Sequence, residues 1–324
     1  MIYNEAQLGH FIDFELWQDS CRLQEEKINL ISKNKNFSTL NIHYFSKIKK
    51  RVRWAYSQDK YFRDRISNNI FYGLKNEFFI KKYALPKNIY GLRNYSFISY
   101  GLNLVHNSIG LYLVKLTDDF MHNYYKKVKT IRSFYGGNLK YNNGQISFKG
   151  KNIYYRSEYN KFRKELVDVI ENRDNVVIRL DFQNYFDNLS IEVLLYNLKA
   201  SIKSTDIAKY KFSDSSIEEI TFFFKYLMNN KSGIPQIDSC VVSGYIGYLY
   251  LCFLDLEIDT LMKQLSFHDS HIIRYVDDLY IVFKRGESET KDNTLKRAVE
   301  LLGKVKDLAY YKYKLNIKIH GHFL

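Results

Sequence analysis

The chain has 324 residues, and its 49 Lys and Arg against 35 Asp and Glu leave a formal net charge of +14. A chain of this length can bury a sizeable core and can hold two or more lobes. The positive surplus favours a polyanionic partner, either nucleic acid or an anionic membrane surface.

Aromatic residues make up 17% of the chain, with 29 Tyr and 23 Phe. We expect a basic surface interleaved with rings that can stack on bases. An AT-rich genome would also enrich Lys, Asn, Ile and Tyr. Composition alone therefore does not separate nucleic-acid binding from codon bias.

The sequence shows no sign of export or membrane insertion. Cys21, Cys240 and Cys252 lack the paired spacing of a disulfide or metal framework, and the last two lie in apolar stretches typical of buried thiols. The N-terminus has neither the basic nor the apolar segment of a secretory signal. No uninterrupted apolar run approaches the roughly 18 residues of a membrane span. These features predict a soluble, cytoplasmic protein with no membrane partner.

The first half of the chain is expected to be mainly helical. A helical region is predicted from about 11 to 84, ended by Pro86, and a second from about 97 to 127. Asn142-Asn143-Gly144 lies between two short β-prone runs and predicts a hairpin, because Asn-Gly suits a type I′ turn. A helix is predicted over 158–171.

The second half alternates strands and helices. Its predicted elements are a strand at 176–181, helices near 191–202 and 217–228, a long apolar helix at 239–262, a hairpin at 272–283, a helix at 292–311 and a strand at 315–319. This order is typical of a split βαβ sheet with helices on one face. The expected fold class is α+β.

Two adjacent acids mark the predicted hairpin. In Tyr275-Val276-Asp277-Asp278, β-branched and aromatic residues on both sides place the acids at the turn. Neighbouring carboxylates repel each other and are tolerated mainly where a divalent cation neutralises both. Asp181 ends the 176–181 strand and would meet Asp277 at the sheet edge if that strand pairs beside the hairpin, although Asp181 taken alone fits a turn or cap better. We expect two Mg²⁺ ions there, about 3.5–4 Å apart, with Mn²⁺ as the alternative.

Three motifs resemble, in order, motifs A, B and C of reverse transcriptases. They are Leu180-Asp181 with Tyr185-Phe186-Asp187, then Ser232-Gly233-Ile234-Pro235-Gln236, then Tyr275-Val276-Asp277-Asp278. The Tyr-x-Asp-Asp element is specific to that class in a way that a lone Asp-Asp pair is not. The resemblance covers about 155–320 firmly and 80–155 more loosely. It implies a right-hand polymerase fold, with a helical N-terminal region over 1–84, fingers over 85–170 and a palm with a ferredoxin-like sheet over 171–324.

The resemblance implies roles for the acids. Asp181, Asp277 and Asp278 would be the catalytic residues and metal ligands. The backbone carbonyl of Phe182 would complete one metal shell.

It also implies contacts for the substrates. Phe186 falls where the family places an aromatic gate against a ribose 2′-hydroxyl, which implies selection of dNTPs, although it also fits a core Phe. Tyr185 would lie at the nucleotide, and Gln236 would contact the incoming nucleotide or the template. Tyr275 would abut the primer end.

Motif B departs from the family pattern. Most reverse transcriptases follow Pro-Gln with Gly, whereas Ile237 and Asp238 follow here, and the small pair Ser243-Gly244 comes several positions late. A Gly at that point lets the backbone approach the nascent base pair. Ile237 therefore argues against ordinary template reading.

A second resemblance concerns the expected fingers. Leu85-Pro86-Lys87-Asn88-Ile89, followed by Arg93 and Tyr95, is similar to a segment of the abortive-infection (Abi-type) reverse transcriptases of bacterial phage defence. That group is associated with protein-primed, often template-independent DNA synthesis. The resemblance makes Arg93 and Lys87 candidates to grip the triphosphate, with Lys81 and Lys82 as weaker ones, although each also fits a solvated surface charge. Retron and group II intron enzymes share the three motifs but fit the long helical region less well.

The segment after Asp278 matches motif D in position. Lys318, in the last predicted strand, would be the general acid near the leaving pyrophosphate. We recognise no primer-grip hairpin and no thumb beyond it. The expectation is a clamp supplied by a partner subunit or by further copies of the chain, unless products are short or the chain is a fragment.

Two other functions stay open. The chain could be a non-catalytic nucleic-acid-binding or assembly subunit that kept the palm. An RNA-dependent RNA polymerase is the other alternative, against which Phe186 and the Tyr-Val-Asp-Asp element argue. The expected partners are dNTPs, a DNA product and, where one is used, an RNA template; the sequence identifies neither primer nor preferred base.

Overall fold

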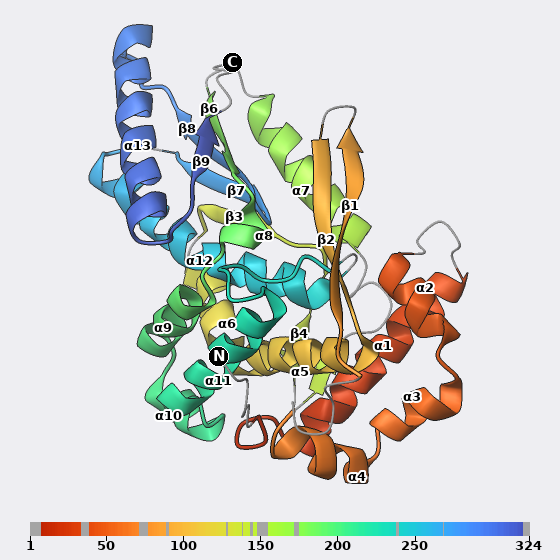
Figure 1. Ribbon diagram of the computed structural model, residues 1–324. Helices are drawn as coiled ribbons and strands as arrows, with labels where there is room; N and C mark the ends of the chain where they lie inside the picture. The colour runs from red at the N-terminus through yellow and green to blue at the C-terminus, as the bar shows by residue number, and fades with distance from the viewer. Residues whose placement is uncertain are drawn as a thin grey trace.

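The structure is a computed structural model in which the main sheet lies in the upper part of the view with helices on either side, and most of the helices gather below it (Figure 1). It describes residues 8–33, 39–70, 77–88, 91–127, 129–137, 139–142, 145–147, 155–171, 175–237, 240–267 and 269–319. Helices and the sheet share one buried core, as expected for an α+β protein.

The N-terminal region is helical, as predicted. Its elements are α1 (Phe14–Lys33), α2 (Leu40–Lys47), α3 (Lys50–Tyr56), α4 (Asp59–Tyr61) and a π-helical segment, η2 (Phe62–Ser67). Thr39 caps α2, because its hydroxyl accepts the Ile42 amide at 3.3 Å. Helix α1 packs along α5 (Tyr100–Leu116), every residue of which is buried.

The predicted helix does not continue to residue 84. Instead, β1 (Ile80–Asn88) pairs antiparallel with β2 (Gly91–Ile98) as a long hairpin that projects from the molecule (Figure 1). Tyr83 and Tyr95 are cross-strand partners, and their rings stack at 5.6 Å. Pro86, expected to end a helix, lies within β1 next to an irregularity in the pairing, where a strand tolerates the missing amide donor.

The region from 97 to 127 is helical, as predicted, but it contains a break. Helix α5 ends at Leu116 and α6 (Asp118–Lys127) begins after Thr117. The Thr117 hydroxyl donates a hydrogen bond to the Leu113 carbonyl and lies 2.5 Å from the Tyr245 hydroxyl.

Strands β4 (Lys140–Asn142) and β5 (Gln145–Ser147) pair as the predicted Asn-Gly hairpin requires, while Asn143 and Gly144 lie outside the described residues.

The described strands of the main sheet lie in the order β3-β7-β8-β6-β9. They are β3 (Ile131–Phe134), β7 (His271–Tyr275), β8 (Asp278–Lys284), β6 (Asn175–Phe182) and β9 (Ile317–Ile319). The hairpin, β6 and β9 match the predicted strands. Strand β3, which pairs parallel with β7, was not predicted.

Helices cover both faces of this sheet, which differs from the expected arrangement. Arg274 of β7 contacts α12 (Val241–Gln264), whereas the next residue, Tyr275, contacts Phe162 of α7 (Tyr155–Ile170). Successive strand residues point to opposite faces, so α12 and α7 lie on opposite sides. Helix α7 thus packs on the face that was expected to be open.

The remaining helices are mostly as predicted. They are α8 (Tyr185–Asn188), α9 (Ile191–Ser201), α10 (Ser204–Lys209), α11 (Asp214–Leu227) and α13 (Lys291–Tyr311), of which α8 and α10 were not expected. Within the described residues, α12 is the one helix long and apolar enough to cross a membrane. Most of it is buried inside the fold, so it is the core helix of this protein.

A buried ion pair joins the sheet to α12. Arg274 and Asp255 are both fully buried, and Nε and Nη2 of Arg274 donate to the Asp255 carboxylate at 2.7–3.0 Å. Nη1 donates to the Val276 carbonyl at 2.8 Å, and Nη2 also reaches the Tyr248 carbonyl at 3.2 Å. The guanidinium thereby fixes the end of β7 against the core helix.

Asp255→Asn should destabilise the fold strongly, because it leaves the Arg274 charge buried without a counter-charge. We expect the free energy of unfolding to fall by about 3–5 kcal/mol, measured by urea denaturation followed by circular dichroism. Glu192→Gln is the matched control: it breaks the exposed Lys225–Glu192 pair and should cost less than about 1 kcal/mol. Equal, small losses in the two variants would contradict the role of the buried pair.

Candidate active site

The structure brings the three predicted acids together where two inner strands of the sheet, β6 and β8, come to their ends. Asp181 of β6 and Asp278 of β8 are direct cross-strand partners, so their side chains lie on the same face. Asp277 lies in the turn between β7 and β8, whose last and first residues, Tyr275 and Asp278, are paired. The sequence prediction that Asp181 meets the acidic hairpin is confirmed as geometry.

The turn that carries Asp277 has an unusual backbone. Val276 has φ 51°, in the left-handed region that β-branched residues rarely adopt. Its amide donates to the Phe134 carbonyl at 2.9 Å, and its carbonyl accepts Arg274 Nη1. Contacts on both sides of the residue therefore hold it in this conformation, which the sequence analysis did not foresee.

The charges at this edge are unfavourable for Asp277. Burial, together with the neighbouring Asp278 and Asp181 carboxylates, raises the pKa of its carboxyl to about 6, although the Arg93 guanidinium opposes the shift. Arg93 is exposed on β2, so the β1–β2 hairpin places a positive charge within electrostatic range of the acids. The site has a surplus of negative charge that a cation would relieve.

The third acid is paired with an arginine. Oδ1 of Asp278 lies 3.3 Å from Nη2 of Arg179, and about half of each side chain is exposed. An ion pair this open contributes at most about 1 kcal/mol, so a bound cation could displace the arginine. Among the described residues, no group of three His, Cys, Asp or Glu side chains is arranged to hold a metal ion as it stands.

Carboxylates are nevertheless the right donors for a hard divalent cation. The Asp278 and Asp181 carboxylates both act on that of Asp277, and Asp278 is also paired with the exposed Arg179. The residues therefore fit Mg²⁺ or Mn²⁺ chemically once Asp278 leaves Arg179.

Lys318 lies next to the same acids. In the pairing of β6 with β9, its partner is Asp181, and the neighbouring pair is Phe182 with Ile317. Lys318, Asp181 and Asp278 thus follow one another across three adjacent strands. The sequence did not foresee that Lys318 would flank Asp181 directly.

The predicted nucleotide residues pack against α12. Tyr185 is buried and its hydroxyl donates to the Gly247 carbonyl, while Phe186 is half-buried beside it. A Cβ on Gly247 would lie 3.1 Å from the Phe186 ring and 3.2 Å from the Tyr185 ring. Glycine at 247 lets both rings approach the helix, a contact that no sequence motif had marked.

Hydrogen bonds join motif B to the segment that carries Phe186 and to β2. The Ile234 amide donates to the Phe186 carbonyl at 2.8 Å, and Gly233, at φ 113°, leaves no room for a Cβ beside the Asp187 carbonyl. The Gln236 carbonyl accepts the Ser96 amide of β2 at 2.8 Å. Ile237, which argued against template reading, is buried.

The basic residues predicted to bind the triphosphate have different surroundings. The positive charge of Arg93 lowers the pKa of Asp277, whereas Lys82 Nζ donates to Ser96 Oγ at 2.9 Å within its own hairpin. Lys81 is exposed, and the side chain of Lys87 lies outside the described residues. Tyr275 contacts the Tyr159 and Phe162 rings of α7 at 5.1 and 5.6 Å.

A polar cluster is buried beneath motif B. Cys240 Sγ lies 3.9 Å from His106 Nδ1, 4.0 Å from Lys27 Nζ and 3.5 Å from the Ser243 amide. Burial would raise the pKa of the thiol, but Lys27 and His106 outweigh it and lower the pKa to about 5. The Cys240 sulfur therefore joins α1 and α5 to the start of α12, and both Cys240 and Cys252 are free and buried, as predicted.

Comparisons with known proteins give a distant likeness. No family model matches the chain, and no curated protein matches it. Among solved structures it is similar to apo telomerase from Candida tropicalis truncated from its C-terminal domain, with 15% identity and a TM-score of 0.38 over 73% of this chain and 48% of that one. The chain spans about half the length of that telomerase.

Asp277→Asn should stabilise the protein at neutral pH. The folded pKa of about 6 exceeds the ordinary 3.8, so the native state binds the extra proton between these values and wild-type stability rises as pH falls from 7 to 4. We expect the variant to be more stable than wild type by ~1–3 kcal/mol at pH 7, and the difference to vanish near pH 4, by urea denaturation. Asp307→Asn, an exposed site on α13, should show neither effect. A variant no more stable than wild type at pH 7 would refute the crowded-charge interpretation.

Proposed function

We propose that this protein is a reverse-transcriptase-like DNA polymerase that transfers nucleotides from dNTPs to a hydroxyl group. The observation that carries the proposal is the meeting of Asp181, Asp277 and Asp278 at the sheet edge, with Asp277 on a strained turn and its pKa raised. Strained backbone and perturbed carboxyl groups concentrate at functional sites.

The acids would hold two Mg²⁺ ions, or Mn²⁺, together with the carbonyl of Phe182. When bound, the metal supplies charge neutralisation, activation of the attacking hydroxyl and polarisation of the phosphate. The chain's own cations flank this position. Arg93, from the β1–β2 hairpin, is suited to bind the triphosphate, and Lys318, beside Asp181, is suited to donate a proton to the leaving pyrophosphate from its Nζ.

Sugar selection would lie with Phe186. Its ring is fixed between Tyr185 and Gly247, so it cannot withdraw freely from a nucleotide bound beside the acids. A ring in that place would clash with a 2′-hydroxyl, which favours dNTPs. Gln236 lies in the loop tied to Phe186 and β2, where it would face the nucleotide or the template.

The biological setting belongs to the same proposal. The 85–95 segment resembles Abi-type enzymes, and this supports a role in bacterial anti-phage defence, in the cytoplasm, with protein-primed or template-independent synthesis. Ile237 in motif B favours that group over a retron or group II enzyme that reads an RNA template. A partner subunit or a second copy of the chain would hold the product.

A second candidate function is a non-catalytic nucleic-acid-binding subunit. The Arg179–Asp278 pair favours it, because the pair neutralises one of the acids without a metal. The two functions differ in whether bound nucleic acid is extended.

Substitution of the acids separates these functions. Wild type should incorporate dNTPs, offered singly and together with Mg²⁺, in preference to rNTPs. Asp181→Asn and Asp277→Asn should each reduce incorporation by at least about 100-fold, because each removes charge worth several kcal/mol at the transition state. Radiolabelled product on denaturing gels is the readout, with Asp307→Asn as the control.

Three outcomes would overturn the proposal. Acid variants as active as wild type would show that these residues are not the catalytic group. Salt-dependent DNA or RNA binding by a wild-type protein that extends nothing would favour the binding subunit. Use of rNTPs to the exclusion of dNTPs would point to an RNA polymerase.

A further inference from the structure

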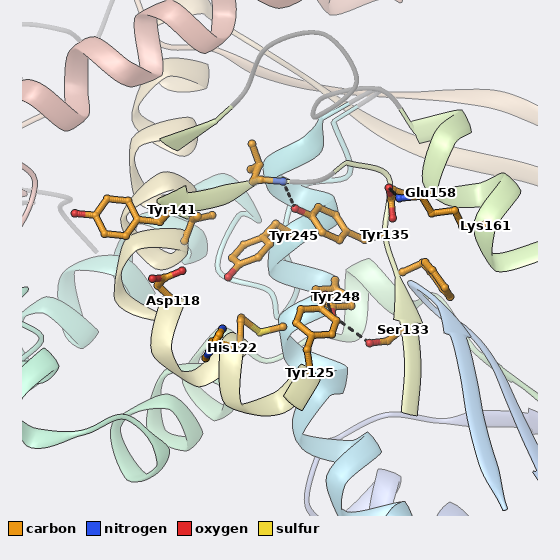
Figure 2. A pocket seen from close by; sticks show the side chains of 14 residues that line it. Asp118, His122, Tyr125, Ser133, Tyr135, Tyr141, Glu158, Lys161, Tyr245 and Tyr248 are labelled. Carbon is orange, nitrogen blue, oxygen red and sulfur yellow. Dashed lines mark hydrogen bonds and ion pairs between the residues drawn. The ribbon is translucent and has the colours of Figure 1, made fainter. Parts of the chain in front are cut away.

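The aromatic side chains of this protein differ in whether a ring face is open to solvent. Tyr135, Tyr245 and Tyr248 lie between α6, β3 and α12 (Figure 2), where they are buried, and Tyr135 stacks on Tyr248 with ring centroids 4.9 Å apart. Of the two tryptophans, Trp17 is buried, whereas Trp54 of α3 is 64% exposed. Trp54 therefore offers an open aromatic face on which a flat ligand can stack.

Contacts on one side of α3 fix which of its residues face outward. Arg53 Nε and Nη2 donate to the Glu25 carboxylate at 2.7 and 3.2 Å, and its Nη1 donates to the Ile48 carbonyl at 2.7 Å. The Tyr56 carbonyl accepts the indole N–H of Trp17 at 2.8 Å. These bonds hold one side of α3 against α1, so the opposite side of this helix, which has no buried residue, faces solvent.

The outward side of α3 combines the indole ring with positive charge. Lys50 and Arg51 precede Trp54 by four and three residues, the spacings that place side chains next to each other on a helix. Both are exposed, as are Lys47 and Lys49 just before them. The four cations and Trp54 together form the α3 patch. Figure 1 shows α3 at the periphery of the molecule, away from the strands that carry the acids.

The charge of the α3 patch is not neutralised by neighbouring acids. Residues 40–67 contain eight Lys and Arg against two Asp, so this short segment carries +6 of the net charge of +14. Asp59 pairs with Arg63 at 2.6 Å, and Glu25 pairs with Arg53 on the inner side of α3. In the part of the chain that the structure describes, no carboxylate forms an ion pair with the four cations of the patch. The patch therefore favours an anionic partner.

Nucleic acid fits this patch better than an anionic membrane surface does. A helix that lies in a membrane surface needs one continuous apolar face. The other large apolar side chain exposed on α3, Val52, is two residues from Trp54 and so lies about 160° around the helix from it. Trp54 instead shares its side with cations, an arrangement that suits a base beside its phosphates.

We propose that the α3 patch binds single-stranded nucleic acid, with one base stacked on Trp54 and neighbouring phosphates on Lys50 and Arg51. The base must be unpaired, because a base inside a duplex has no free face for the indole. DNA and RNA strands share this chemistry, and the test distinguishes them. The patch is separate from the acids and needs neither a metal nor a dNTP, so it stands or falls independently of the proposed function.

Trp54 reports on the site directly, because the other tryptophan is buried. Titration of wild type with dT₂₀ or rU₂₀, in EDTA and without dNTPs, should quench tryptophan fluorescence, whereas an abasic strand of equal length should not. In fluorescence anisotropy, Trp54→Ala should bind the base-bearing strand roughly 5- to 100-fold more weakly, the range for one stacked base, and the abasic strand unchanged. Trp54→Phe should retain most of the affinity, since a ring remains. The strand that shows the larger loss is the partner.

A double variant, Lys50→Gln with Arg51→Gln, tests the phosphate contacts. It should weaken binding of all three strands and lower the slope of log K against log salt by about 1.4, because each phosphate contact on a single strand contributes about 0.7. The matched control for charge is Lys296→Gln with Lys306→Gln, which removes two exposed lysines of α13. The control for the ring is Tyr196→Ala, since Tyr196 is 58% exposed on α9.

The proposal fails if Trp54→Ala binds dT₂₀ and rU₂₀ as wild type does, or if it weakens the abasic strand equally. It fails as well if the double variant changes binding no more than the α13 control. A fluorescence response to vesicles of phosphatidylserine and phosphatidylcholine, with none to the three strands, would identify a membrane contact and overturn the proposal. Quenching in the wild type needs no variant, so a variant that does not fold leaves the test intact.

Discussion

The buried ion pair between Arg274 and Asp255 is the interaction on which the acidic edge of the sheet depends. The guanidinium lies between β7 and α12 and also binds the carbonyls of Val276 and Tyr248. It therefore connects the core helix with the turn that carries Asp277. Because a buried charge without its partner is very unfavourable, the turn cannot move away from α12 without a large loss of stability.

This rigid support explains how the turn holds features that oppose folding. Val276 has a left-handed backbone that costs about 1–3 kcal/mol, and the Asp277 carboxyl is crowded by two other acids. Both features oppose folding, although the Val276 amide and carbonyl are hydrogen-bonded to Phe134 and Arg274. Residues that destabilise the native state at one position are expected where function requires them. A cation shared by the acids would neutralise the repulsion between their carboxylates. Holding Asp277 beside that cation would then be the function of the strained turn.

The sequence predicted elements whose signals are local and missed those that depend on distant partners. Helices α12 and α13 and the β7–β8 hairpin follow from their own hydrophobic patterns. In contrast, the part of β1 up to residue 84 was predicted as helix, because its pairing of Tyr83 with Tyr95 is not visible locally. Strand β3 is four residues long and pairs with a strand far along the chain. The acids were found because adjacent carboxylates are rare in apolar runs. Arg274 and Asp255 had a comparable signal, since each is a charge within an apolar element, and asking what neutralises them would have paired them.

Diffraction from crystals soaked in Mn²⁺ tests the central claim most directly, because the anomalous signal locates the ion without any assumption about activity. We predict Mn²⁺ density in contact with the carboxylates of Asp181 and Asp277, with Asp278 turned away from Arg179 to join them. Mn²⁺ bound elsewhere, with the Arg179–Asp278 pair intact and no density at the turn, would contradict the proposal that this edge of the sheet is a metal-dependent active site.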